Sequence, residues 1–344
     1  MNEYLILANP GHNRIYFETA LKIAISELRA IGEAHGLDMR DIELAETALP
    51  ASIKFTTNRE LTEEEFKTLG TSSVFYALFE LVDSNLLKPI NVPDFHTFPE
   101  SMVQILKYNG KTNEQFTRLM VNLALSACKT TTPNKTLLDP MCGKGTTLYE
   151  GYIRGLDVTG IEVNSKWFLE IKNYVTRYFK EGKYKHRTEK SKRVGAKGKK
   201  IADVFSVKAA VTKEDFKNEK LQQMQVFTAD TSNADKLLKK KSFDVIVCDL
   251  PYGVQHGMKN KMEDIVSRSP LALLKKAVPA WKHVMRVNGS MVLAYNELTV
   301  KYGEIAKVLS ENGLEVLDEE PYADYIHRVD QSINRNLIVA VKKN

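Results

Sequence analysis

The sequence predicts an α/β protein: a doubly wound, Rossmann-like sheet with an antiparallel C-terminal edge, preceded by a small N-terminal α+β domain. Two observations predict the larger fold. From Asn113 onward, apolar strand segments alternate with amphipathic helical segments, which is typical of βαβ units on a parallel sheet. A glycine-containing loop also follows the first of these strands and opens a helix, as in folds that bind a ligand at the carboxyl ends of their strands.

The N-terminal part of the chain, residues 1–90, is predicted to be a small domain with RNA docking as its candidate role. Its expected elements are strands at 3–8 and 51–57, a helix at 17–34, and one or two helices at 61–82 opened by Thr62 as N-cap. Three prolines between Lys88 and Pro99 indicate an extended linker, which we place at residues 91–108.

The larger domain is expected to span residues 109–344. Its expected strands are 135–139, 157–163, 224–230, 243–249 and 289–296, and its expected helices are 113–128, 145–155, 164–180, 232–240 and 270–286. Two further apolar segments, 314–326 and 335–343, have no helix between them. We therefore expect them to form an antiparallel pair at the edge of the sheet.

A lysine- and arginine-rich insertion, residues 181–220, interrupts the alternation and is longer than an ordinary helix-to-strand connection. Its first half contains few apolar residues, so we expect residues 181–200 to be flexible. Such a basic segment suits contacts with the phosphates of a nucleic acid.

The overall composition is that of a globular protein, with 344 residues, 43% hydrophobic residues and a formal net charge of +6. The three cysteines have no CxxC spacing, so we expect neither a disulfide framework nor a metal site. No apolar run is long enough to span a bilayer, and the N-terminus lacks the pattern of a signal peptide. We therefore expect a cytoplasmic protein without a membrane partner.

The loop after the first strand of the larger domain reads LLDPMCGKGTT. Gly143 and Gly145 allow the backbone to approach a ligand closely, and the following helix N-terminus offers free N–H groups. The pattern is neither GxGxxG nor a P-loop, and Asp139 ends the strand. An acid there favours a cationic ligand over a pyrophosphate, and S-adenosylmethionine carries an ammonium and a sulfonium. The other candidate cofactor-binding residues in this loop are Pro140, Cys142, Thr146 and Thr147.

Acids also end the next two strands. Glu162 lies about twenty residues after the glycines, the spacing at which an acid binds ribose hydroxyls. Asp230 ends the third strand, where the adenine amino group would lie. Acids cap helices at many strand ends, but three of them beside a glycine loop favour a cofactor site.

The segment CDLPYGVQHG follows the apolar strand FDVIV. An acid, a proline and a tyrosine in succession after a buried strand suit a pocket for a flat, polar ring such as a nucleobase. The lone pair of an exocyclic amine on such a base is delocalised into the ring, so the amine needs acceptors on its N–H bonds before it attacks a methyl group. The Asp249 carboxylate and the Leu250 carbonyl offer such acceptors, and Pro251 stiffens the loop. Tyr252 offers a face for stacking, and we also count Asp249 among the cofactor-binding residues.

Further candidate substrate-binding residues are Gly253, which leaves room for the sugar-phosphate, together with Gln255, His256 and Arg328. Cys248 precedes the acid, and strand alternation turns it away from Asp249, so we interpret it as a core residue.

The segments DPMCGKGTT, GIEVN and DLPYG, preceded by NEQFTRLMVNLAL, together resemble a class I S-adenosylmethionine-dependent amino-methyltransferase. Over residues 109–344 the chain is similar to the tRNA guanine-N2 methyltransferases and UPF0020-like RNA methylases. The resemblance implies S-adenosylmethionine as cofactor, structured RNA (tRNA or rRNA) as substrate, and guanine N2 as the methylated atom. That family often carries an N-terminal THUMP module, and residues 1–90 are too short for a complete one with its ferredoxin-like unit.

The residues alone leave the substrate open, because adenine N6, cytosine N4 and guanine N2 all fit the same pair of acceptors. A DNA adenine-N6 or cytosine-N4 methyltransferase is one alternative, although no segment has the size of a target-recognition domain. An alternative of another class is a non-catalytic RNA-binding protein on a methyltransferase fold. The intact glycine loop and the acid-proline-tyrosine set disfavour it.

Overall fold

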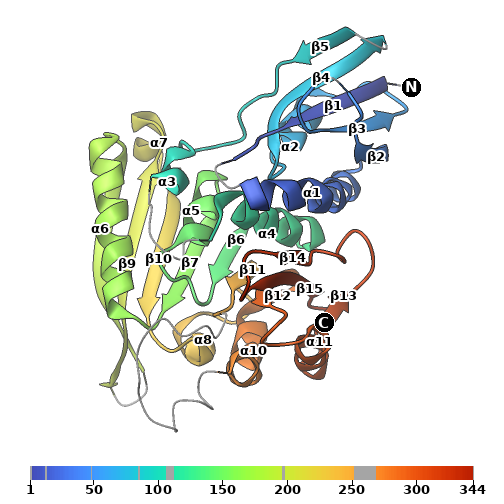
Figure 1. Ribbon diagram of the computed structural model, residues 1–344. Coiled ribbons are helices and arrows are strands. Elements are labelled where there is room, and N and C mark those ends of the chain that lie inside the picture. The colour runs from blue at the N-terminus through green and yellow to red at the C-terminus, as the bar shows by residue number, and fades with distance from the viewer. Residues whose placement is uncertain are drawn as a thin grey trace.

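The computed structural model describes residues 2–11, 14–47, 49–83, 86–105, 112–195, 198–251 and 269–343. Within these ranges the strands form two sheets, one of five strands in the N-terminal part and one of ten strands in the rest of the chain (Figure 1). The α/β class and the small N-terminal α+β domain are as predicted.

The N-terminal sheet is antiparallel and has the strand order β2-β3-β1-β4-β5. Its strands are β1 (Asn2–Ala8), β2 (Arg40–Leu44), β3 (Ser52–Thr57), β4 (Phe75–Asp83) and β5 (Leu86–Ile90), and its helices are α1 (Arg14–His35) and α2 (Glu63–Leu69). Thr62 caps α2 as predicted, because its side chain accepts a hydrogen bond from the Glu65 N–H.

One prediction for this domain is wrong: the part of the predicted helical segment 61–82 that lies beyond α2 contains strand β4. An apolar run of this length fits a helix or a strand, and the two neighbours β1 and β5 decide for the strand. The exposed edge strand β2 has four exposed residues out of five, so it gave no apolar signal in the sequence.

The predicted linker is in contact with the larger domain. The Thr97 N–H donates a 2.7 Å hydrogen bond to the Ile153 carbonyl, and the Phe98 side chain is buried. A short helix, α3 (Ser101–Gln104), follows. We propose the domain boundary at Ile90, where β5 ends. The predicted start of the larger domain, residue 109, lies outside the described residues.

The strands of the larger domain are β6 (Thr136–Asp139), β7 (Asp157–Glu162), β8 (Lys185–Val194), β9 (Lys200–Ala210), β10 (Gln222–Thr228), β11 (Phe243–Asp249), β12 (Met285–Asn296), β13 (Glu315–Leu317), β14 (His327–Arg328) and β15 (Asn334–Val341). Their order is β13-β15-β12-β11-β6-β7-β10-β9-β8, and β14 pairs with β15. The five strands from β12 to β10 are parallel, whereas both ends of the sheet are antiparallel. This confirms the doubly wound sheet and its antiparallel C-terminal edge.

Helices cover both faces of this sheet. The first face carries α4 (Glu114–Ala127), α5 (Thr146–Ile153) and α6 (Ser165–Glu181), whose apolar residues share a core with the N-terminal domain. The second carries α8 (Ala234–Leu237), α10 (Pro270–Val284) and α11 (Tyr302–Glu311). The sequence reading missed α11, which lies between β12 and β13.

A buried polar cluster joins the N-terminal domain to the first helical layer. Glu27 on α1 is fully buried and accepts a 2.9 Å hydrogen bond from the Ser73 N–H and another from the side chain of Asn122 on α4. Arg154, at the end of α5, donates a hydrogen bond to the side-chain Oδ1 of Asn122. Burial raises the pKa of Glu27. These contacts fix the N-terminal sheet against α4.

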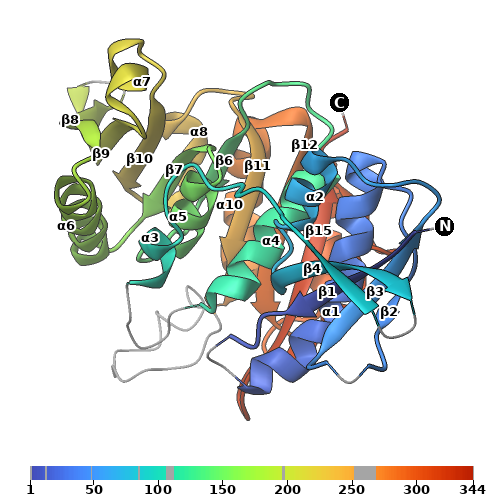
Figure 2. The same ribbon diagram turned by 90° about the horizontal axis from the view of Figure 1, so that it is seen from above.

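The expectation of a flexible segment at 181–200 is wrong for its described residues, because they contain most of the β8–β9 hairpin. β8 pairs with β9 along its length, and β9 pairs with β10, so the insertion extends the central sheet (Figure 2). The apolar side chains that hold it come from its second half, where Phe205, Val207 and Ala209 alternate along β9 and are buried. A short helix, α7 (Lys213–Lys217), follows.

Candidate active site

The candidate site lies at the carboxyl edge of the parallel strands, where β6, β7 and β11 end in Asp139, Glu162 and Asp249. The register places Asp139 beside Gly160 of β7, and Glu162 beside Thr228 of β10. The structure therefore brings together three of the four predicted acids at one edge. Asp230 follows β10 two residues later.

Asp139 is the most buried of these acids. Its Oδ1 accepts a 3.1 Å hydrogen bond from the Met141 N–H, and the Thr147 side chain also hydrogen-bonds to its carboxylate. Burial, together with the negative charges of Asp249 and Glu162, raises the pKa of Asp139 to about 7.

The loop between β6 and α5 needs glycine at Gly145. Its φ is +91°, and a Cβ there would lie 2.9 Å from Cζ of Tyr149. Gly143 also has a positive φ, +53°, but a Cβ there would meet nothing within 4 Å. A side chain at Gly145 would therefore collide with Tyr149 of α5, whereas the space beside Gly143 is open. Cys142 is buried below it, and Thr146 and Thr147 form the first turn of α5.

Glu162 holds this loop in place with both carboxylate oxygens. Oε2 accepts a 2.9 Å hydrogen bond from the Gly143 N–H, and Oε1 accepts a 2.7 Å hydrogen bond from the Asn164 N–H. Burial raises the pKa of Glu162. The next residue, Val163, is 73% exposed. Val163 was not among the site residues predicted from the sequence, although it is an apolar residue that directly follows an acid at a strand end.

Asp230 lies further out and already has partners. Its Oδ1 accepts a 2.8 Å hydrogen bond from the Ser232 N–H and so caps the 3₁₀ helix Thr231–Asn233, while its Oδ2 pairs with Lys276 Nζ at 3.1 Å. Its carboxylate therefore acts as a helix cap, and its predicted contact with the adenine amino group stays a prediction.

Asp249 accepts a hydrogen bond from a residue that is distant in the sequence. The Thr112 hydroxyl, next to the N-terminus of α4, donates a 2.6 Å hydrogen bond to Asp249 Oδ2. The Leu250 N–H donates to the Ala294 carbonyl of β12 at 2.9 Å, which fixes the chain where it leaves the sheet, and Pro251 is exposed. The sequence reading missed Thr112.

The other predicted substrate-binding residues cannot all be placed. Tyr252, Gly253, Gln255 and His256 lie outside the described residues. Arg328 is exposed on β14, where its Nε donates a 3.2 Å hydrogen bond to the Asp330 carbonyl.

The three cysteines are buried and free of disulfides. Burial raises the pKa of the Cys142 and Cys248 thiols well above the ordinary range. The prediction that Cys248 is a core residue is confirmed. Within the described ranges, no group of three or more histidine, cysteine or acidic side chains is arranged to hold a metal ion, and no helix is long and apolar enough to cross a membrane.

The sequence also matches a protein-family model. The model of UPF0020, described as the RMKL-like methyltransferase domain, matches residues 105–315. The chain belongs to this family. As a UPF0020 methyltransferase it uses S-adenosylmethionine, as the sequence predicted.

Three of the solved structures similar to this UPF0020 methyltransferase are structures of methyltransferases. A TehB-like enzyme from Corynebacterium glutamicum is 15% identical, with 62% of this chain and 83% of that chain covered and a TM-score of 0.34. A T. thermophilus 16S rRNA N2 G1207 methyltransferase, solved with AdoMet and guanosine, is 13% identical to this chain. The match covers 63% of this chain and 37% of that chain, with a TM-score of 0.31. The magnesium protoporphyrin IX methyltransferase of Synechocystis PCC 6803 is 12% identical to this chain. The match covers 69% of this chain and 90% of that chain, with a TM-score of 0.40. No curated protein matches the sequence.

The donor groups of the UPF0020 methyltransferase site fit its cofactor. Asp139 and Glu162 are buried carboxylates, and among the described residues their hydrogen-bond partners are backbone N–H groups and a hydroxyl rather than basic side chains. Such a set favours a ligand with positive charge and hydroxyl groups. The open side of Gly143 leaves space beside the loop for it.

Proposed function

We propose that this methyltransferase transfers a methyl group to an exocyclic amino group of a nucleobase, with guanine N2 in tRNA or rRNA as the first candidate. The observation that carries the proposal is the position of Asp249. Its carboxylate ends β11 at the same edge as Asp139 and is held by Thr112, directly before Leu250 and Pro251.

The cofactor-binding residues in this proposal are Asp139, Pro140, Cys142, Gly143, Gly145, Thr146, Thr147, Glu162, Asp230 and Asp249. Glu162 binds the ribose hydroxyls, and Asp139 faces the cationic amino acid end. S-adenosylmethionine supplies an electrophilic methyl group on a sulfonium sulfur. The exposed Val163 side chain offers an apolar surface for the adenine ring.

The chain's part in the chemistry is to hold and orient the amine. The Asp249 carboxylate and the Leu250 carbonyl accept hydrogen bonds from the two N–H groups, which favours a pyramidal nitrogen with its lone pair free. The hydrogen bond from Thr112 limits the rotation of the Asp249 carboxylate. Asp249 also accepts the proton that the amine loses. Positioning of this kind supplies most of the rate in a direct displacement.

The remaining substrate contacts are proposals for residues around the motif. Tyr252 stacks on the base, Gly253 leaves room for the sugar-phosphate, and Gln255 and His256 contact the base or its phosphate. Arg328 is exposed and available to nucleic acid. The target base has to leave its stack to reach Asp249.

RNA is preferred over DNA because the described parts of the chain contain a basic hairpin and a small N-terminal domain rather than a large DNA-reading domain. The experiment is to incubate the protein with methyl-labelled S-adenosylmethionine and either total RNA or genomic DNA, and to identify the labelled nucleoside by mass spectrometry. N2-methylguanosine from RNA is the expected product. Labelled N6-methyladenine or N4-methylcytosine from DNA would support the DNA alternative, and cofactor-independent RNA binding without any product would support the non-catalytic one.

Cofactor binding is expected to depend on pH through Asp139. In the part of the chain that the structure describes, the titratable groups that face it are the carboxylates of Asp249 and Glu162 and the thiols of Cys142 and Cys248, and none of these is a cation. With a pKa of about 7, well above the model-peptide value, Asp139 keeps its proton in the folded protein below pH 7 and must lose it to bind a cation.

The affinity for S-adenosylmethionine should therefore rise with pH from 5.5 to 7, by up to about tenfold per pH unit, and level off above. By the same linkage, the free energy of unfolding of the free protein falls as pH rises from the unfolded pKa toward 7, because the folded state binds the extra proton. Calorimetry in buffers of different ionisation enthalpy would measure the proton release. Asp139→Asn should abolish the pH dependence, and an unchanged pH profile in this variant would contradict the assignment.

A further inference from the structure

A cavity of about 430 Å³ lies between α6 and the β8–β9 hairpin. Figure 2 shows α6, β8 and β9 side by side at the end of the molecule opposite the N-terminal sheet. The cavity borders the candidate active site, because its lining includes Ser165, next to the Asn164 that bonds Glu162, and Thr228, the register partner of Glu162. The proposed function gives this cavity no task.

Three lysines line the cavity. Lys172 comes from α6, and Lys190 and Lys192 come from alternate positions of β8, so both face the same side of the hairpin. Lys172 and Lys190 line the same cavity, and the proximity of Lys190 lowers the pKa of Lys172. Several ammonium groups around one cavity repel one another and favour the binding of an anion.

The one acid among the lining residues, the register partner of Lys192, offsets only part of this charge. Asp203 also lines the cavity, but its Oδ2 pairs with Lys200 Nζ at 2.8 Å. Across the described ranges of the chain, none of the three lysines forms an ion pair with an acidic side chain.

The wall formed by α6 is apolar. Phe168 is nearly buried, whereas Leu169 is 48% exposed although it lies beside the three cations. An apolar surface next to unpaired ammonium groups matches a nucleotide, which combines a flat base with a phosphate.

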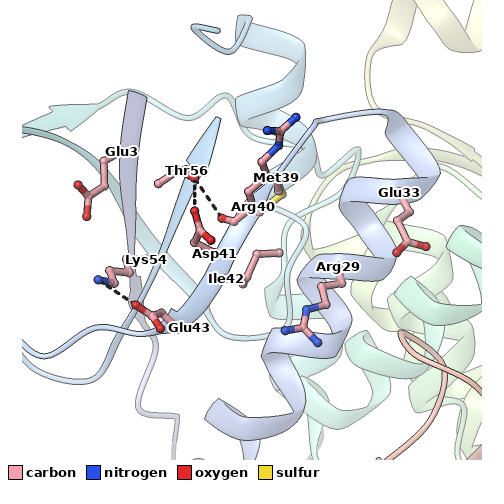
Figure 3. Close-up of a pocket in the computed structure, with 10 residues that line it drawn as sticks. All are labelled: Glu3, Arg29, Glu33, Met39, Arg40, Asp41, Ile42, Glu43, Lys54 and Thr56. Carbon is pink, nitrogen blue, oxygen red and sulfur yellow. Dashed lines mark hydrogen bonds and ion pairs between the residues drawn. The ribbon is translucent and has the colours of Figure 1, made fainter. Parts of the chain in front are cut away.

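A second cavity, lined by described residues, has a balanced set of charges for comparison. It measures about 750 Å³ and lies in the N-terminal domain between α1 and strands β2 and β3 (Figure 3). Its cations have acidic partners: Lys54 pairs with Glu43 at 2.9 Å, and Arg29 and Arg40 pair with Glu320 and Asp38. That cavity therefore has no comparable preference for an anion.

We propose that the cavity between α6 and the β8–β9 hairpin binds a nucleotide of the substrate RNA that flanks the target base, with the phosphate on Lys172, Lys190 and Lys192 and the base against Leu169. This inference rests on the proposed function in that it takes RNA as the substrate. It explains why the insertion is built into the sheet, since strand pairing holds Lys190 and Lys192 at a fixed distance from the cofactor edge.

The test is the double variant Lys190→Ala/Lys192→Ala, compared with Lys185→Ala/Lys208→Ala. The control removes the same charge from the same hairpin, at exposed positions of β8 and β9 outside the cavity. Binding of a fluorescent, unmodified tRNA transcript is measured by anisotropy over a range of salt concentrations. The cavity variant should bind on the order of tenfold more weakly, with a log Kd against log salt slope reduced by about 1.5. The control should change the slope less, and neither variant should change the Kd for S-adenosylmethionine.

Methyl transfer to the same RNA separates this inference from the proposed function. If the wild type methylates RNA and the cavity variant retains its affinity, KM and salt slope, the inference is wrong and the function stands. If the wild type methylates no RNA but its RNA affinity depends on Lys190 and Lys192, the site stands and the function is wrong. Equal losses in the cavity and control variants would indicate attraction by net charge alone and would also overturn the inference. Lys190→Arg/Lys192→Arg should restore the affinity.

Discussion

Replacing Asp249 with alanine should lower kcat for methyl transfer by at least about 10³-fold, while the Kd for S-adenosylmethionine, which Asp139 and Glu162 mainly determine in this proposal, changes less than about threefold. The side chain removed is the acceptor that orients the amine and takes its proton. The two buried carboxylates of the cofactor site, Asp139 and Glu162, stay in place. Rapid-quench kinetics with saturating RNA would measure kcat, and calorimetry would measure cofactor binding.

Two further variants show whether Asp249 acts through its charge and its orientation. Asp249→Asn keeps the shape but loses the charge, and should be nearly as inactive. Thr112→Val removes the hydroxyl that donates to Asp249 Oδ2 and keeps the side-chain shape, so kcat should fall only about tenfold, at unchanged KM for the cofactor. Full turnover by Asp249→Ala would refute the proposed chemistry.

The parallel core of the fold was predictable because its strands are buried on both faces and read as short apolar runs. Two of the places where prediction failed have a common cause. Residues 75–83 and 185–194 have ambiguous or polar sequences, and they are strands because neighbouring strands pair with them. β8 has an exposed side chain at nearly every position, so its structure depends on β9 rather than on its own residues.

For the candidate site, sequence spacing predicted the residues that end parallel strands, because the topology brings such ends to one edge. It could not predict Thr112, which lies 137 residues before Asp249 and reaches it only through the packing of α4 against the sheet. Nor could it show that Glu162 binds the Gly143 N–H, since this depends on the shape of the glycine loop. Glu162 therefore holds the loop, in addition to its proposed role of binding ribose.

Glu162→Ala should therefore raise the Kd for S-adenosylmethionine by about 100-fold or more. The variant loses the proposed hydrogen bonds to ribose, and it leaves the N–H groups of Gly143 and Asn164 without their acceptor, so the loop loses its fixed position. Glu162→Gln keeps two hydrogen-bonding atoms but only one acceptor, and should lie between the two. Calorimetry at pH 8, above the pKa of Asp139, would measure these affinities.

The matched control is Asp157→Ala, at the opposite end of the same strand. Asp157 also uses its carboxylate to hold a backbone group, accepting a 2.7 Å hydrogen bond from the Gln223 N–H. Its loss should cost about 1–2 kcal/mol of unfolding free energy, measured by denaturant titration, and leave the cofactor Kd unchanged. If both variants lowered cofactor affinity equally, the effect of Glu162 would be one of general stability. If only Glu162→Ala lowers it, the end of β7 that carries the glycine-loop contact is the end that binds the cofactor.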